Sequence, residues 1–475
     1  MENQITEPNA TFTETPSFWQ SYKFVFKGLF IGFLILLMLI PSFFVQNLVH
    51  ERATRKDEVV AEVSKKWGNT QTIYGPLLVI PYMKTVPLAD NKTKDIKDFI
   101  YYLPESLQVS GDAQAESRHR SIYDVTLYKT NIHINGKYSP NLLANSGVDS
   151  QKILWKEAYL QLGLSDIKGL EKQISVNWDN SLKGDFDVIN YSSNINDVVA
   201  DTDDASVANT TKSVSSRSGH SDLSFPIDFD PNKNHDFNIE LYAKGSGGLY
   251  FTPTGSQTEV TLKSSWKSPS FDGNYLPSNS PDSVNVNGFA ANWNIPKASR
   301  PYSQVNVGTM PNLDASVFGV QLLQPNDSYA KNERSAKYAI LFVTLTFAVF
   351  FLMELLQKKS IHFLQYILVG FALILFYVLL LSISEYAGFN MAYFIAALSI
   401  ILLISLYVGA ILHSKKAGAS FGFGLAALYG FIFFLIQKED YTLLYGSIGL
   451  FIVLALIMYF TRKLNQEGNK QLALN

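Results

Sequence analysis

Cysteine is absent from the 475 residues of this chain. Disulfide bonds, a thiol nucleophile and cysteine-ligated zinc are therefore excluded. The chain also lacks a surplus of positive charge, because 39 Lys and Arg residues are balanced by 41 Asp and Glu residues. This near-neutral balance provides no basic patch of the kind that nucleic-acid binding requires.

Motifs for metals and phosphates are missing as well. None of the seven histidines forms an HExxH or similarly spaced pair, so the sequence predicts no metal site. His119 and His133 could approach each other across neighbouring strands, but two exposed strand histidines are the simpler interpretation. The glycine-rich run 245–248 lacks the downstream Lys-Ser/Thr of a phosphate loop and is interpreted as a turn. We therefore expect no cofactor.

One pentapeptide, Gly418-Ala-Ser420-Phe-Gly422, matches the nucleophile elbow of serine hydrolases. That chemistry needs a sharp strand-to-helix turn with His and Asp partners in reach. Here the pentapeptide lies inside an apolar stretch long enough to span a membrane, without a strand before it. Its glycines at positions i and i+4 favour close helix packing in lipid instead. No catalytic residue is therefore assigned.

Apolar residues are segregated along the chain. Residues 47–335 carry nearly all of the Asp, Asn, Ser and charge, whereas 336–461 is dominated by Leu, Ile, Phe, Ala and Tyr. A soluble core does not separate its residues in this way, but a membrane protein must. The first apolar run has no small-residue cleavage site after it, so it is interpreted as a retained anchor. The six expected transmembrane helices are 28–45, 338–356, 363–383, 391–412, 417–436 and 441–460.

Lysine and arginine in short loops predict the orientation of these spans. Basic pairs follow the second, fourth and sixth spans, whereas the opposite turns 384–390 and 437–440 hold one lysine between them. Arg52, Arg55 and Lys56 beyond the first span disagree, but large domains translocate largely regardless of charge. The expected architecture is a cytoplasmic tail and anchor (1–46), a periplasmic domain (47–335), a five-helix membrane domain (336–461) and a cytoplasmic tail (462–475).

The periplasmic domain is expected to open with a juxtamembrane helix over 51–67, where valines and Trp67 recur at helical spacing. Alternating patterns then predict β-strands, and no sustained helix pattern separates them. These features favour an all-β fold of one or two antiparallel sandwiches. Strands are expected at 72–82, 124–134, 223–229, 237–243 and 249–252, with a meander over 237–266 and a flexible polar insert at 191–222.

Polar side chains at membrane depth are the candidate functional residues, because placing an ionisable group in lipid is costly. Glu354 is expected to reach towards Lys358, one turn away, and Glu385 towards the outer interface. Such interfacial placement favours structural anchoring over a proton or ion path. Arg334 and Lys337 are expected to contact lipid headgroups or the outer domain. The complete set is Arg334, Lys337, Glu354, His362, Gln365, Ser384 and Glu385.

Three C-terminal segments, 334–354, 362–370 and 379–389, resemble the CreD family of inner-membrane, cell-envelope-integrity proteins. The resemblance extends over essentially the whole chain, although the insert at 191–222 is an addition. Tyr386 stands where the family often has a histidine, so a proton relay through that position is not expected. Shorter matching pieces are 75–77, 103–107, 264–266, 269–271 and 276–277.

The resemblance implies a bacterial inner-membrane protein linked to envelope integrity, and the family offers no catalytic residue or cofactor to transfer. We therefore expect a non-enzymatic protein that contacts the lipid bilayer and an envelope component or membrane protein partner. A transporter or channel-like protein that uses Glu354, Gln365 and Glu385 is the first alternative. A stress sensor that acts through a membrane partner is the second.

Overall fold

The computed structural model describes residues 23–87, 92–140, 146–189, 221–278, 284–285, 287–324, 328–357, 361–438 and 441–461. The chain forms two compact units: a helical unit of Met1–Arg55 and Asn326–Asn475, and a β unit of Lys56–Pro325. The insert predicted at 191–222 lies outside the described residues except for Ser221 and Asp222, which begin a strand.

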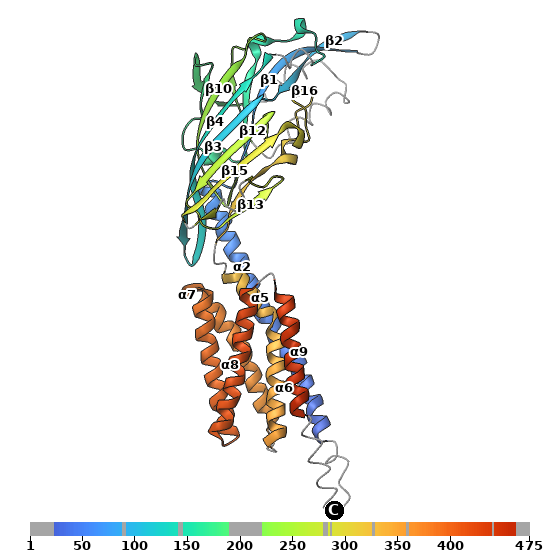
Figure 1. The fold of residues 1–475 in the computed structure, drawn as a ribbon, viewed down its shortest axis with the longest axis vertical. Helices are drawn as coiled ribbons and strands as arrows, with labels where there is room; N and C mark the ends of the chain where they lie inside the picture. Colours follow the sequence, from blue (N-terminus) through green and yellow to red (C-terminus); the bar gives the residue numbers. More distant parts are fainter. Residues whose placement is uncertain are drawn as a thin grey trace, which may run out of the picture. The chain divides into compact units, whose positions relative to one another are not determined.

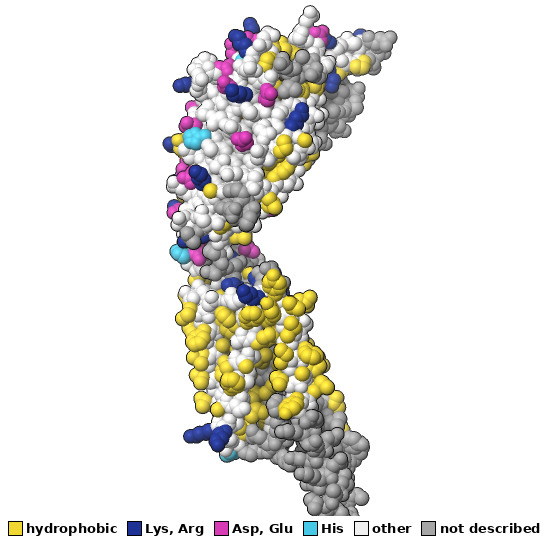
Figure 2. All heavy atoms as spheres, viewed as in Figure 1, with side chains coloured by type: hydrophobic (Ala, Val, Ile, Leu, Met, Phe, Trp, Pro, Cys, Tyr) yellow, Lys and Arg dark blue, Asp and Glu magenta, His cyan; other side chains and the backbone are white. Residues whose placement is uncertain are grey.

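The helical unit is built from long apolar helices (Figure 1). Hydrophobic side chains cover the visible face of this unit in Figure 2, as expected of a surface that contacts lipid. Three helices, α2, α7 and α8, are long and apolar enough to cross a membrane, and the pair α5 and α6, bent by 46°, makes a possible fourth span. The helices are α2 (Lys23–Trp67), α5 (Ser328–Lys337), α6 (Ala339–Gln357), α7 (Phe363–Ile411), α8 (Lys415–Gln437) and α9 (Thr442–Thr461).

Helix α7 consists of two helices that meet at Gly388. This glycine has φ 73° and ψ 162°, a conformation that residues with a side chain rarely adopt. The break lies inside the turn predicted over 384–390, so two predicted spans are joined without a loop. Among the described residues, three to four helical segments are long and apolar enough to span a membrane, one of them N-terminal, where the sequence predicts six.

The β unit contains a nine-stranded sheet and an eight-stranded sheet (Figure 1). The larger sheet has the order β13 (Pro269–Gly273), β17 (Phe318–Leu322), β11 (Gly248–Phe251), β1 (Gln71–Pro87), β5 (Tyr159–Leu164), β9 (Ser221–Pro226) and β8 (Asp187–Val188), with β2 (Thr93–Tyr102) beside β1 and β16 (Val305–Val307) beside β2. The smaller sheet has the order β14 (Val284–Asn285), β15 (Gly288–Pro296), β12 (Gln257–Ser264), β3 (Ser106–Arg120), β4 (Tyr123–Tyr138), β10 (His235–Ser246), β6 (Ser175–Trp178) and β7 (Leu182–Asp185).

Both sheets are mixed, so the expectation of purely antiparallel sheets is wrong. Strand β1 runs parallel to β11, and β3 runs parallel to β12. The meander predicted over 237–266 is also wrong, because the chain leaves the eight-stranded sheet after β10 and enters the other sheet at β11. Gly247, with φ 74°, lies at this crossing. Alternating patterns identify strands but not their partners, and only the partners distinguish a meander from a crossing between sheets.

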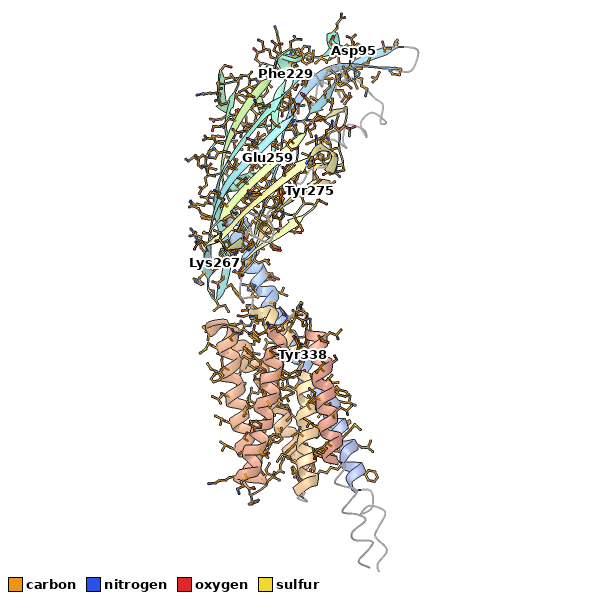
Figure 3. All side chains as sticks on the ribbon, viewed as in Figure 1. Asp95, Phe229, Glu259, Lys267, Tyr275 and Tyr338 are labelled. Atoms are coloured by element: carbon orange, nitrogen blue, oxygen red, sulfur yellow. The ribbon has the colours of Figure 1, made fainter. Side chains whose placement is uncertain are left out.

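One hydrophobic core contains side chains from both sheets, so the β unit is a single sandwich. The alternation of β10 places Phe237, Ile239 and Leu241 inside, at 3% exposure or less. Trp178 of β6 and Trp293 of β15 are among the largest fully buried side chains. Figure 3 draws the side chains of both sheets on the ribbon.

The two histidines that could have met across strands do not do so. The register of β3 and β4 places His119 opposite Asp124 and His133 opposite Ser110. The side chain of His119 is 79% exposed, and its Nδ1 contacts Asp124 Oδ1. They are therefore two separate strand histidines, which is the simpler of the two sequence interpretations.

Candidate functional site

Glu354 of α6 is surrounded by hydrogen-bond donors from three parts of the helical unit. Lys27 Nζ of α2 donates to Oε1 of this carboxylate, and also to the carbonyl of Ile361 at 2.7 Å. Tyr366 OH of α7 donates to Oε2 at 2.8 Å, and the Ile361 N–H donates to Oε1 at 3.2 Å. Glu354 is only 5% exposed, so these donors replace the water that a carboxylate otherwise binds. Lys27, Glu354, Ile361 and Tyr366 form the inner cluster.

Among the described residues Lys27 pairs with the Glu354 carboxylate, a partner that the sequence did not predict. The predicted partner, Lys358, lies outside the described residues. Lys27 directly precedes the first apolar run, while Glu354 lies near the end of another. A cation and an acid at matching ends of two spans are at a matching membrane depth, and this is the signal that the sequence interpretation missed.

A second polar group gathers around Ser384 and Glu385 of α7. Asn332 Nδ2 of α5 donates to Ser384 Oγ at 2.6 Å, and both side chains are buried. Tyr329 OH donates to Glu385 Oε1 at 3.1 Å, and a guanidinium nitrogen of Arg52 lies 3.8 Å from the same oxygen. These five residues form the outer cluster, which joins α2, α5 and α7.

The inner and outer clusters lie far apart. Lys27 and Arg52 are 25 residues apart on α2, which corresponds to about 37 Å along a helix axis at 1.5 Å per residue. Twenty-five residues also amount to about seven helical turns, so both cations belong to one face of α2. The polar residues predicted at membrane depth therefore do not form a single site. Instead, α2 supplies one cation to each of the two carboxylates.

Comparison with known proteins shows the family of this chain. The family model described as "Inner membrane protein CreD" matches residues 23–467. The chain belongs to the CreD family. It is 29% identical over 440 residues to the inner membrane protein CreD of Escherichia coli (strain K12), and the match covers 91% of each chain. A multi-pass location in the inner membrane follows for this CreD-family protein, in agreement with its apolar helices.

His362 and Gln365 of this CreD-family chain form the start of α7. His362 Nδ1 accepts a hydrogen bond from the Leu364 N–H at 3.3 Å, and Gln365 Oε1 accepts one from the His362 N–H at 3.0 Å. This reciprocal arrangement is a capping box, which satisfies N–H groups that the helix itself leaves open. Both side chains therefore serve the helix end beside the inner cluster.

Arg334 and Lys337 lie in the last turn of α5, where positive charge is favourable for the helix dipole. Lys337 Nζ lies 3.1 Å from Glu333 Oε1 on the same helix, and both side chains are largely exposed. Such an exposed pair contributes little to stability.

The Gly-x-Ser-x-Gly pentapeptide lies within α8, as the packing interpretation requires. A Cβ atom on Gly418 would lie 2.7 Å from the carbonyl oxygen of Ser405 and 2.8 Å from the Cα of Gly409, both in the second half of α7. Ser420 is exposed and belongs to the same continuous helix, without the strand-to-helix turn of a nucleophile elbow. The glycines therefore permit close contact between α7 and α8.

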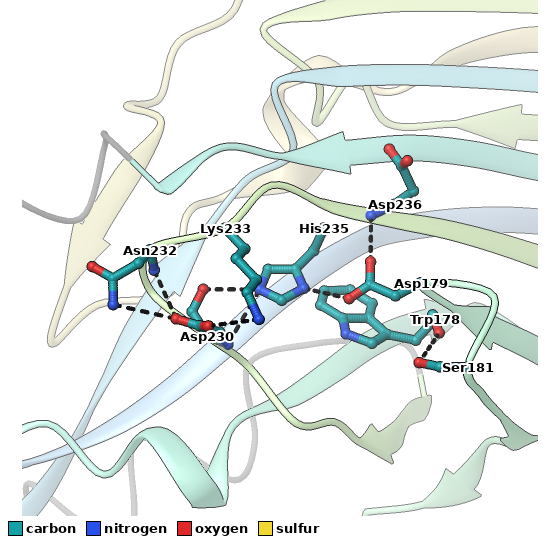
Figure 4. A network of polar contacts seen from close by, with 8 residues as sticks. All are labelled: Trp178, Asp179, Ser181, Asp230, Asn232, Lys233, His235 and Asp236. Carbon is teal, nitrogen blue, oxygen red and sulfur yellow. Dashed lines mark hydrogen bonds and ion pairs between the residues drawn. The ribbon is translucent and has the colours of Figure 1, made fainter.

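A buried histidine in the β unit was not singled out from the sequence (Figure 4). His235 is 3% exposed, with Nδ1 2.6 Å from Asp179 Oδ2 and Nε2 2.9 Å from the carbonyl oxygen of Asp230. Its ring stacks on Trp178, and Asp179 also accepts the Asp236 N–H at 2.8 Å. No group of three His, Asp or Glu residues suited to a metal ion occurs in the described part of the chain. The network ties the β6–β7 turn to the start of β10.

Proposed function

We propose that this CreD-family protein is not an enzyme, and that it supports cell-envelope integrity through its β unit while the helices anchor it. The pairing of membrane-depth carboxylates carries this proposal. Glu354 and Glu385 each lie next to a cation of α2, so both charges connect helices. Truncating one partner of the buried Lys27–Glu354 pair leaves an uncompensated charge, which makes this pair suited to fixing the anchor.

A polar groove on the β unit supports a binding role. It crosses the face of the eight-stranded sheet that points away from the core, and its volume is about 550 Å³. Its lining mixes hydroxyl, amide and oppositely charged side chains, including Ser110, Asp112, Asn131, His133, Tyr242 and Lys263. A concave surface with several kinds of polar group suits a polar ligand or partner from the envelope.

We further propose six spans with both termini in the cytoplasm and the β unit in the periplasm. The break at Gly388 supports this count, because it divides α7 into two helices. The bent pair α5 and α6 supplies one span, and α9, with its apolar stretch Leu443–Leu456, supplies another. The distribution of Lys and Arg in the short loops favours the orientation.

Single cysteines in this cysteine-free chain test the orientation directly. In spheroplasts, a membrane-impermeant maleimide is expected to label Tyr386→Cys, because this side chain is 83% exposed beside the break in α7. His413→Cys, between α7 and α8, is expected to react only after the membrane is permeabilised. Labelling with a permeant maleimide is the control for thiol reactivity. Reaction of His413→Cys alone in intact spheroplasts would reverse the proposed orientation.

Complementation of a deletion strain tests the function. Uptake of a normally excluded dye is expected to rise on deletion and to return to the wild-type level when the strain is complemented with Lys27→Met plus Glu354→Leu. This double variant removes both charges of the pair, so neither is left uncompensated, and it removes a transport residue from α6. A second deletion strain is complemented with the single variant Glu385→Gln. An unchanged barrier in the deletion strain under several stresses would contradict the proposal.

A transporter or channel-like function is the alternative, and buried hydroxyl groups favour it. Among the described residues, Thr346 Oγ1, Tyr377 OH and Tyr429 OH are buried in the helical unit without a hydrogen-bond partner. Unsatisfied polar groups are costly in lipid, and functional sites are one reason to retain them. If Lys27→Met plus Glu354→Leu or Glu385→Gln is produced normally but fails to restore the barrier, transport becomes the better explanation.

A further inference from the structure

Arg300 of the β unit is a buried cation without a counter-ion. It is 7% exposed and follows a short 3₁₀ helix, Lys297–Ser299, that leads out of β15. Within the described chain, no Asp or Glu forms an ion pair with it. Buried arginines are normally paired with an acid, because an uncompensated charge is unfavourable away from water. Burial also lowers the pKa of this guanidinium.

The protein supplies hydrogen-bond partners for only some of the N–H groups of this guanidinium. Arg300 Nη2 donates to Gln304 Oε1, an oxygen that Ser256 Oγ also contacts at 2.8 Å. The ring of Tyr302 lies 5.3 Å from the guanidinium carbon and covers one of its faces. Arg300 Nε and Nη1 have no hydrogen-bond partner in the described structure, and they carry three of the five N–H groups.

A neighbouring loop contributes another unused donor. Tyr302 OH donates to the carbonyl of Pro253 at 3.1 Å, which holds the segment 253–256 against Tyr302 and Gln304. Within this segment Thr254 is fully buried, and its hydroxyl lacks a partner in the described chain. Positive charge and unused hydrogen-bond donors therefore meet where the β11–β12 and β15–β16 connections come together.

We propose that Arg300 anchors a binding site for a small oxyanion, either a carboxylate or a phosphate group. Such an anion supplies the missing negative charge, and its oxygens accept the N–H groups that the protein leaves open. Tyr275 marks the entrance, because it is partly exposed and its hydroxyl donates to the carbonyl of Ser299 at 2.7 Å (Figure 3). Binding of the ligand displaces this side chain, since Nε and Nη1 are covered in the unliganded protein.

Tryptophan fluorescence of the full chain in detergent provides the test. Five of the six tryptophans belong to the β unit, so the thermal transition seen by this probe reports the unfolding of that unit. The transition is measured in sodium phosphate, acetate and chloride at equal ionic strength and pH. A phosphate or acetate concentration at ten times its Kd is expected to raise the midpoint by roughly 3–5 °C over chloride. A rise in the midpoint with phosphate alone would identify a phosphate group as the ligand, and a rise with acetate alone would identify a carboxylate.

The variants separate this site from a general salt effect. Arg300→Met is expected to lose the midpoint rise, and Arg300→Lys, which keeps the charge without the planar fork, is expected to retain part of it. Arg120→Met is the matched control, because Arg120 is an exposed arginine of the same unit whose side chain is 63% accessible. A wild-type chain that responds to phosphate and acetate as it does to chloride overturns the proposal. An undiminished response in Arg300→Met overturns it as well.

Discussion

Replacing Glu354 by leucine while Lys27 is kept is expected to destabilise the helical unit by about 3–5 kcal/mol. The ammonium of Lys27 would then be left beside the carbonyl of Ile361 without its carboxylate. Its side chain is only 19% exposed, so water replaces the lost partner poorly. Lys27→Met is expected to have a similar effect, because it leaves the Glu354 carboxylate without its counter-ion. Removing both charges, with Lys27→Met and Glu354→Leu, should restore most of the stability.

A reporter thiol makes this measurement possible in detergent. Ala396→Cys places a single cysteine at a fully buried position of α7, and its reaction with a maleimide follows unfolding by increasing concentrations of SDS. Lys337→Met is the control, because its pair with Glu333 is largely exposed and should contribute little. A double-mutant cycle then gives the coupling free energy of the buried pair. Equal stability of Glu354→Leu and the unaltered chain would contradict the role assigned to the inner cluster.

Gly418→Val is expected to destabilise the helical unit by about 1–3 kcal/mol through overpacking. Its side chain would be forced against the backbone of Ser405 and Gly409, neither of which can be moved by a rotamer change. Gly424→Val is the matched variant, because a Cβ atom on this glycine of the same helix meets nothing within 4 Å. Gly424→Val should be neutral or slightly stabilising, since valine has the better helix propensity.

The same assay addresses the resemblance to a nucleophile elbow. Ser420→Ala removes the only hydroxyl of the pentapeptide, yet it is expected to leave both stability and barrier function unchanged. If Gly418→Val and Gly424→Val were equally stable, close contact of α7 and α8 would not explain these glycines. Loss of barrier function in a stable Ser420→Ala variant would instead reopen the catalytic interpretation.

The sequence is informative wherever one stretch of chain determines the outcome. The apolar runs indicate a membrane protein with an N-terminal anchor helix, and strands β1, β4, β9, β10 and β11 occupy the positions where alternation predicts them. A helix over 51–67 is likewise present, as the C-terminal part of α2. These elements depend on local periodicity, which a single sequence displays.

Features that depend on distant partners could not be obtained in this way. Lys27 and Glu354 are separated by 327 residues, and nothing near either residue identifies the other. The same limit applies to the parallel neighbours β1 and β11, whose patterns suit either direction of pairing. Arg300 is a third example, because an arginine in a polar connection looks exposed until the surrounding loops are placed.

The parallel pairing of β3 with β12 also determines when the β unit can fold. Ser106 is paired with Gln257, and Gln71 of β1 with Leu249 of β11, so both sheets join segments separated by most of the unit. Loop closure over such distances slows folding, and the early strands keep open edges until the later strands have been synthesised. Newly made chains are therefore expected to pass through an interval of vulnerability to proteolysis and aggregation, which ends only when β17 takes its place between β13 and β11.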